Sequence, residues 1–145
     1  MTKHPGDSSE QQEVEEWLVA ALSKKLGITL SKKRWPLDEG SWIEIDGYSQ
    51  YPQVLCEAWA HIGVPKPAQK NKVMTDAFKL LFINRLVEGG TKKILLFADH
   101  EAAAHFQGKS WMAQCLKYFD IIIEIIDLPP DLKTQVLKAQ QRQYR

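Results

Sequence analysis

Asp46 and Glu57 are the residues whose types and spacing point most directly to chemistry. They lie in the segment IEIDGYSQYPQVLCEAWAH, whose alternation is typical of a β-hairpin. A tight turn centred between Tyr51 and Pro52 places Asp46 directly opposite Glu57 on the neighbouring strand. Two carboxylates at that range repel each other unless a cation lies between them. Because Mg²⁺ sites use one or two carboxylates plus water, the pair predicts a divalent metal site. The alternative is a solvated polar strand face whose acids hold no ligand.

The same alternation divides the predicted hairpin into two faces. Small and branched apolar residues, among them Ile43, Ile45 and Cys56, are predicted to share one face, so Cys56 is expected to be a core residue rather than a nucleophile. The opposite face is predicted to collect the large and charged residues: Trp42, Glu44, Asp46, Glu57, Trp59 and His61.

Other periodic segments supply the elements that must position the acids. Apolar residues at helical spacing predict a first helix that Gly27 ends, and a wider apolar stripe predicts a buried helix at 68–87. Two short apolar runs, KILLFA and IIIEIIDL, predict strands that are covered on both faces and parallel to each other. The sequence therefore predicts an α/β (α+β) fold, a mixed sheet with helices on both faces. In all, the predicted strands are 28–37, 42–49, 54–61, 93–98 and 121–128, and the further predicted helices are 110–118 and 131–143.

The composition bounds the class of protein. The 145 residues suit a single domain, predicted to span 9–145 after a flexible tail at 1–8. The net charge of +1 gives no overall field toward nucleic acid or an anionic membrane. The two cysteines form no disulfide framework, no apolar run reaches the length of a membrane span, and the polar start is unlike a signal peptide. We therefore expect a cytoplasmic protein with no membrane partner.

The order of elements and the spacing of the acids resemble the PD-(D/E)XK (restriction-endonuclease-like) nuclease superfamily. Its core runs α-β-β-β-α-β, here extended by a C-terminal α-β-α. In that superfamily an Asp on the second strand and a Glu or Asp on the third bind the metal, which matches IEID ending at Asp46 and Glu57 within LCEAW. The resemblance implies that Asp46, Glu57 and the backbone carbonyl of Ala58 hold Mg²⁺ or Mn²⁺. Some members place a further acid on the preceding helix, where Glu13 and Glu16 are candidates.

The sequence departs from the superfamily pattern at Trp59, which stands two residues beyond Glu57 where a lysine is expected. In some members that lysine has moved to the following helix, and the segment KPAQKNK offers candidates there. We expect Lys72, with Gln69 beside it, to complete the catalytic set, and Lys70 is the rival. The spacing of the helix places four polar residues on one stripe: Gln69, Lys72, Asp76 and Lys79.

The predicted function is metal-dependent phosphodiester hydrolysis of nucleic acid, with DNA favoured over RNA and with Lys72 positioning water or neutralising developing charge. A homodimer is expected by analogy alone. The main alternative is a catalytically inactive nuclease-like domain that binds nucleic acid or protein. A zinc site built from Glu57, His61 and His100 is a further alternative, although no local spacing enforces it.

Overall fold

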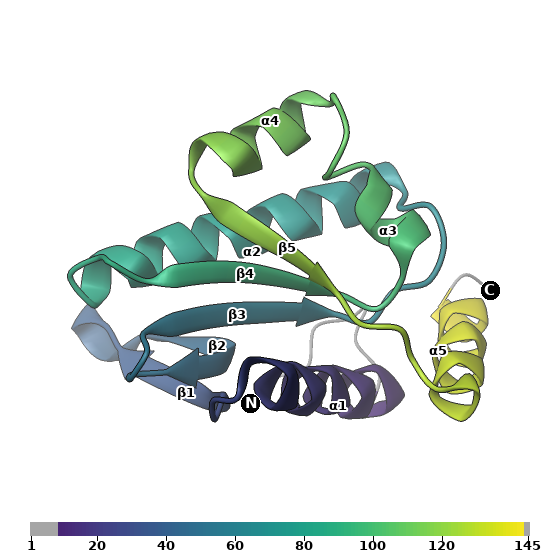
Figure 1. The fold of residues 1–145 in the computed structure, drawn as a ribbon, viewed down its shortest axis with the longest axis horizontal. Coiled ribbons are helices and arrows are strands. Elements are labelled where there is room, and N and C mark those ends of the chain that lie inside the picture. Colours follow the sequence, from purple (N-terminus) through teal and green to yellow (C-terminus); the bar gives the residue numbers. More distant parts are fainter. Residues whose placement is uncertain (1–8, 144–145) are drawn as a thin grey trace.

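The computed structural model describes residues 9–143 and contains a five-stranded mixed sheet flanked by helices (Figure 1). The predicted tail at 1–8 lies outside the described residues. Within the described part of the chain, no helix combines the length and the apolar character that crossing a membrane requires. In chain order the elements are α1 (Ser9–Leu26), β1 (Ser31–Pro36), η1 (Asp38–Gly40), β2 (Trp42–Ser49), β3 (Val54–Trp59), α2 (Pro67–Leu86), β4 (Lys92–Phe97), α3 (His100–Ala104), α4 (Trp111–Tyr118), β5 (Ile121–Ile125) and α5 (Pro130–Gln143).

The strands lie side by side in sequence order, β1-β2-β3-β4-β5. The first three form an antiparallel meander, whereas β3, β4 and β5 run parallel to one another. Parallel neighbours need a crossover, which α2 provides between β3 and β4 and the α3–α4 pair provides between β4 and β5. The predicted mixed sheet, its α-β-β-β-α-β order and its parallel last pair of strands are confirmed.

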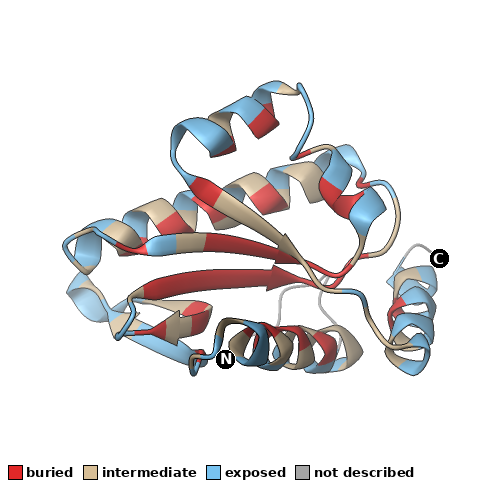
Figure 2. Ribbon diagram, viewed as in Figure 1, coloured by how far each residue is buried: buried red, intermediate tan, exposed pale blue. Residues whose placement is uncertain are grey.

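Helices cover both faces of the sheet, and β3 and β4 are buried between them (Figure 2). On one face, Leu18 of α1 and Val136 of α5 belong to a core cluster that also contains Cys56. On the other face, Leu80 of α2 and Leu116 of α4 belong to a second cluster, which α3 also joins. The fully buried Cys56 confirms the prediction that it is a core residue.

The first strand is shorter than the predicted range 28–37 because the residues before it are tied to the end of α1. The N–H of Ile28 donates to the carbonyl oxygen of Ser23 (3.1 Å), and the N–H of Leu30 donates to the Ser23 hydroxyl oxygen (3.1 Å). These groups are therefore engaged before the β1–β2 ladder begins at Ser31.

β2 contains a bulge that corrects one of the predicted faces. Between the Ser31–Tyr48 and Lys33–Ile45 pairs, β2 has one residue more than β1. An extra residue shifts the alternation, so the side chains before it lie on the opposite face from the one that an unbroken alternation would give them. Ile43 and Ile45 consequently pack with the α2-side cluster and not with Cys56, as the unbroken period had predicted.

The bulge also separates Trp42 and Glu44 from the acids with which they were predicted to share a face. Glu44 lies 3.8 Å from the guanidinium of Arg34, and that guanidinium lies 3.7 Å from the centre of the Trp42 ring. Trp59 packs in the cluster on the α2 side of the sheet, so the predicted face is correct for β3 and wrong for the start of β2.

Gly47, within β2, lies in close contact with α1. A Cβ atom at this position would lie 3.1 Å from Cγ1 of Val19 and 3.4 Å from Cβ of Cys56. We expect Gly47→Ala to lower the free energy of unfolding by about 1–3 kcal/mol through overpacking, measured by urea denaturation. Gly108→Ala is the matched control, because its Cβ would meet only the Ala104 carbonyl oxygen at 3.6 Å. Equal effects of the two substitutions would contradict this account.

Candidate active site

Asp46 and Glu57 lie where β2 and β3 separate. The ladder between these strands runs from the turn to the Gly47–Cys56 pair, so the acids come directly after its last pair. This is the pairing register that the turn predicted. Beyond that point β2 is paired with β1, and β3 is paired with β4. The side chains of the two acids therefore meet in the opening between two neighbouring strands.

Each acid satisfies a backbone group of the opposite strand. The N–H of Asp46 donates to Oε1 of Glu57 (3.0 Å), and the N–H of Ala58 donates to Oδ2 of Asp46 (2.9 Å). Backbone donors that lose their ladder partners inside a protein must find other acceptors. The carboxylates supply them, which fixes the position of both side chains.

The Glu57 carboxyl group is buried and that of Asp46 is half-buried, and removal from water makes their ionised forms costly. Glu57 is 5% exposed. Burial raises the pKa of Glu57 well above its usual range, and the Asp46 carboxylate raises it further, against the opposing effect of Lys79. Burial also raises the pKa of Asp46, although the Ala58 N–H and Lys79 partly offset it. The two acids thus form a pair that a nearby cation would stabilise in the ionised state.

Helix α2 brings two lysines and a third acid to the pair. Nζ of Lys79 lies 3.1 Å from Oε2 of Glu57, and Nζ of Lys72 lies 3.1 Å from Oδ2 of Asp76. Burial lowers the pKa of Lys72, but the carboxylates of Asp76 and Glu15 outweigh it and the pKa is raised. The polar stripe predicted for this helix therefore delivers its charged members to the acids.

The residues predicted to complete the catalytic set, Lys72 and Gln69 with Lys70 as the rival, do not lie together at the two acids. Lys72 contacts Asp76, and Lys79, two turns further along the stripe, is the lysine that contacts Glu57. Gln69 caps the start of α2, where its Oε1 accepts from the Lys66 N–H (2.8 Å). Burial, and then the charge of Lys70, lower the pKa of His105. Within residues 9–143, Lys70 forms no ion pair with Asp46 or Glu57.

Glu15 is the acid of α1 that reaches this region. Its Oε2 accepts from the N–H of Ala60, just after β3, at 3.4 Å. The predicted candidates face other partners: Glu16 lies 3.8 Å from Lys32, and Oε2 of Glu13 accepts from the Gln135 side chain at 3.5 Å. Helical spacing alone could have indicated Glu15, because it lies beside the buried Val14 and one turn before Leu18, on the side of α1 that faces the sheet.

The donor set at the acids fits a hard divalent cation. With all four carboxylates (Asp46, Glu57, Asp76 and Glu15) ionised, they and the two lysines would carry a formal excess of two negative charges, and the raised pKa values of Asp46 and Glu57 reflect the cost of that state. Carboxylate oxygens are the ligands that Mg²⁺ and Mn²⁺ prefer. Across residues 9–143, no group of three or more His, Cys, Asp or Glu side chains is arranged to hold a metal. Any ion would therefore be held by Asp46 and Glu57 and complete its coordination with backbone oxygen and water.

The residues of the zinc alternative do not converge. His61 stacks on the Trp59 ring with centroids 4.5 Å apart, and it is buried. His100 lies at the start of α3, where Nε2 is 3.8 Å from the Asp127 carboxylate. Burial lowers the pKa of His61 to about 4, with Asp99 raising it and Lys66 lowering it further. His61 therefore contributes a neutral ring that packs on Trp59.

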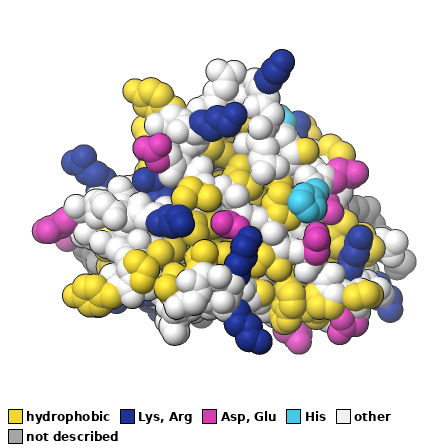
Figure 3. All heavy atoms as spheres, in the orientation of Figure 1, with side chains coloured by type: hydrophobic (Ala, Val, Ile, Leu, Met, Phe, Trp, Pro, Cys, Tyr) yellow, Lys and Arg dark blue, Asp and Glu magenta, His cyan; other side chains and the backbone are white. Residues whose placement is uncertain are grey.

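The face of the molecule drawn in Figure 3 shows no broad region of one charge sign. On the face shown in Figure 3, acidic and basic side chains are interspersed with apolar ones. On β1, Nζ of Lys33 lies 5.4 Å from the ring centres of both Trp35 and Tyr48, which places one cation over two aromatic rings at the sheet edge.

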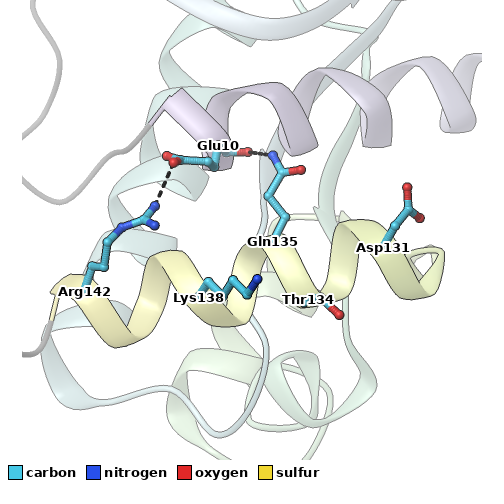
Figure 4. Close-up of a pocket in the computed structure, with 6 residues that line it drawn as sticks. All are labelled: Glu10, Asp131, Thr134, Gln135, Lys138 and Arg142. Carbon is cyan, nitrogen blue, oxygen red and sulfur yellow. Dashed lines mark hydrogen bonds and ion pairs between the residues drawn. The ribbon is translucent and has the colours of Figure 1, made fainter.

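A polar groove between α1 and α5, separate from the acid site, is explained by the packing of those two helices (Figure 4). Nη2 of Arg142 lies 2.7 Å from Oε1 of Glu10, and the side-chain amide of Gln135 donates to the Glu10 carbonyl oxygen at 3.3 Å. These contacts join the two helices that cover one face of the sheet. The groove is lined by Glu10, Asp131, Thr134, Gln135, Lys138 and Arg142.

We expect Asp46→Asn to raise the free energy of unfolding by about 1 kcal/mol at neutral pH without added metal, measured by urea denaturation. The amide keeps an acceptor for the Ala58 N–H and removes one of two like charges that are drawn out of water. Asp127→Asn is the control, since Asp127 is exposed and its change should stay within about 0.5 kcal/mol. A lower free energy of unfolding for Asp46→Asn would contradict this prediction, because it would show that the Asp46 carboxylate stabilises the fold without a metal ion.

His61 should make stability depend on pH. Its pKa is about 4 in the folded protein and near 6.5 when unfolded, so the unfolded state binds the proton more readily. The contribution is present above pH 6.5 and is lost as the pH falls through 4, with a slope of up to about 1.4 kcal/mol per pH unit. Calorimetric unfolding between these pH values should show a smaller slope of stability against pH for His61→Gln than for wild type. An unchanged slope in His61→Gln would contradict the assignment.

Comparison with protein-family models, with curated proteins and with solved structures gives no match for this chain. The resemblance to the PD-(D/E)XK superfamily therefore remains a prediction from the order of elements and the acid spacing.

Proposed function

We propose that this protein is a metal-dependent phosphodiesterase that hydrolyses nucleic acid at the Asp46–Glu57 site. The observation that carries the proposal is the pair of opposed carboxylates, Glu57 buried and Asp46 half-buried, with two lysines of α2 beside them. Buried ionised groups cost free energy, and groups with strongly shifted pKa values concentrate at functional sites. The excess negative charge suits a divalent cation, and the adjacent ammonium groups suit the phosphate that such a cation would hold.

Each residue has a role that follows from its position. Asp46 and Glu57 would hold Mg²⁺ or Mn²⁺, with the Ala58 carbonyl as the backbone ligand that the superfamily resemblance implies. A bound ion of this kind lowers the pKa of a coordinated water and stabilises charge on the phosphoryl oxygens. Lys79 is the first candidate for the missing motif lysine because its ammonium lies on Glu57, and Lys72 is the second.

The reaction needs no covalent enzyme intermediate. A water oxygen attacks phosphorus, the bond from phosphorus to one sugar oxygen breaks, and a proton passes to that leaving oxygen. Lys79 would orient the phosphate and offset the charge that develops on its oxygens. Asp76 would keep Lys72 close to the site through their 3.1 Å contact.

One observation favours a non-catalytic binding module as the second candidate. The Lys79 ammonium already neutralises Oε2 of Glu57, while Oε1 accepts from the Asp46 N–H. A lysine in that position can substitute for a metal ion as the counter-charge. In this case the domain would bind nucleic acid or protein without cleaving it.

A cleavage assay with a metal-binding readout separates the two candidates. We expect wild type with Mn²⁺ or Mg²⁺ to cleave single- or double-stranded DNA or RNA, and Asp46→Asn and Lys79→Met to lower the rate at least about 100-fold. Mn²⁺ should raise the melting temperature of wild type and leave that of Asp46→Asn unchanged. Lys117→Met, at an exposed position of α4, should keep full activity.

The hydrolase proposal is wrong if wild type degrades no substrate above the background of Asp46→Asn and Mn²⁺ produces no shift in melting temperature. Nucleic-acid binding that persists under those conditions would support the binding module. If Lys72→Met abolishes cleavage and Lys79→Met does not, Lys72 becomes the first candidate for the motif lysine and the hydrolase proposal stands.

A further inference from the structure

An apolar groove of about 570 Å³ lies beside the acid site, between α2 and the start of β2. Lys79 belongs to both places, because its residue lines the groove while its ammonium contacts Glu57. Lys79 therefore links the groove to the candidate site. Its lining consists of Ile43, Thr75, Phe78, Lys79, Leu81, Phe82 and Arg85.

Two aromatic rings on consecutive turns of α2 are presented to solvent at this groove. Phe78 is 74% exposed and Phe82 is 44% exposed. Residues four apart on a helix lie on the same side, one turn above the other, so the rings are neighbours along the groove. Two Phe side chains that stay exposed do not contribute the stabilisation that their burial would give. Neighbouring exposed apolar side chains of this kind are characteristic of a binding surface.

The charged residues that line the groove are of one sign, and one of them, Lys79, is paired with Glu57. Its lining contains Lys79 and Arg85 and no acidic residue. Arg85 is exposed, and within residues 9–143 its guanidinium makes no ion pair. The groove thus offers flat apolar rings and a cation at one end, with a second cation where it meets the acids.

This combination fits a ligand with flat rings on an anionic backbone. Sequence-independent binding of single-stranded nucleic acid uses aromatic side chains on which bases stack and cations that follow the phosphates. A second copy of this chain fits less well, because a symmetric contact would bring the same cations of both copies together. Paired bases of a duplex are stacked on each other and cannot lie on the two rings.

We propose that this groove binds unpaired bases of a single-stranded nucleic acid, stacked on Phe78 and Phe82, with Arg85 contacting the backbone that leads to Asp46 and Glu57. The proposal rests on the proposed function for the identity of the ligand, and it adds a preference for single strands.

The test measures binding in EDTA, so that cleavage plays no part. The probes are a fluorescein-labelled oligothymidylate, a duplex of equal length, and an abasic oligomer that keeps the phosphates and lacks the bases. We expect wild type to bind oligothymidylate at least tenfold more tightly than the duplex, and Phe78→Ala/Phe82→Ala to lose about tenfold or more in affinity for it. The same double variant should bind the abasic oligomer as wild type does, whereas Arg85→Gln should weaken binding of both single strands.

Tyr118→Ala and Lys117→Gln are the matched controls, since both side chains are exposed on α4. They should leave every affinity within twofold of wild type. Circular dichroism and sedimentation confirm that the variants are folded and report their oligomeric state.

The inference is overturned if oligothymidylate binding is undetectable, if the duplex binds equally well, or if the double phenylalanine variant binds like wild type. Dissociation of a wild-type dimer by that variant, with nucleic-acid binding unchanged, would also overturn it and assign the groove to contact between copies. Cleavage is read separately. Single-strand binding that depends on the two rings, without metal-dependent cleavage, retains this inference and rejects the proposed function. The reverse pattern rejects this inference alone.

Discussion

Two hydrogen bonds across the strands, from the Asp46 N–H to Glu57 and from the Ala58 N–H to Asp46, are the constraint on which the rest of the structure depends. Two neighbouring strands separate at this point, and each carboxylate accepts a backbone N–H that the ladder no longer satisfies. The acids are held in place by the main chain as a result. Their burial then requires compensating positive charge, which one face of α2 supplies through Lys79 and Lys72.

This arrangement is a poor way to stabilise a fold. Replacing a buried charge cluster with apolar residues of similar volume is often neutral or favourable. The sheet already has two apolar cores, and β3 and β4 are buried throughout their central parts. Keeping ionisable groups between β2 and β3 therefore makes more sense as a requirement of chemistry or binding than as a requirement of folding.

Helix α2 connects the fold to the function we propose. Leu80 and Ile83 anchor it to the sheet, and its polar stripe carries Lys79 to Glu57. A third side of the same helix leaves Phe78 and Phe82 uncovered next to that lysine. Because one rigid element carries the core contacts, the cations and the aromatic rings, their relative positions are fixed together.

The sequence by itself determined the order of the elements, the parallel last strands and the pairing register of Asp46 with Glu57, because these follow from periodicity, run length and a short turn. Only the tertiary structure decided the bulge in β2, which moved Ile43 and Ile45 to the other face. It also decided that Lys79, and not Lys72, reaches Glu57. Periodicity gives the side of an element on which a residue lies. Which turn of a helix lies over a given residue of the sheet depends instead on packing between residues far apart in sequence.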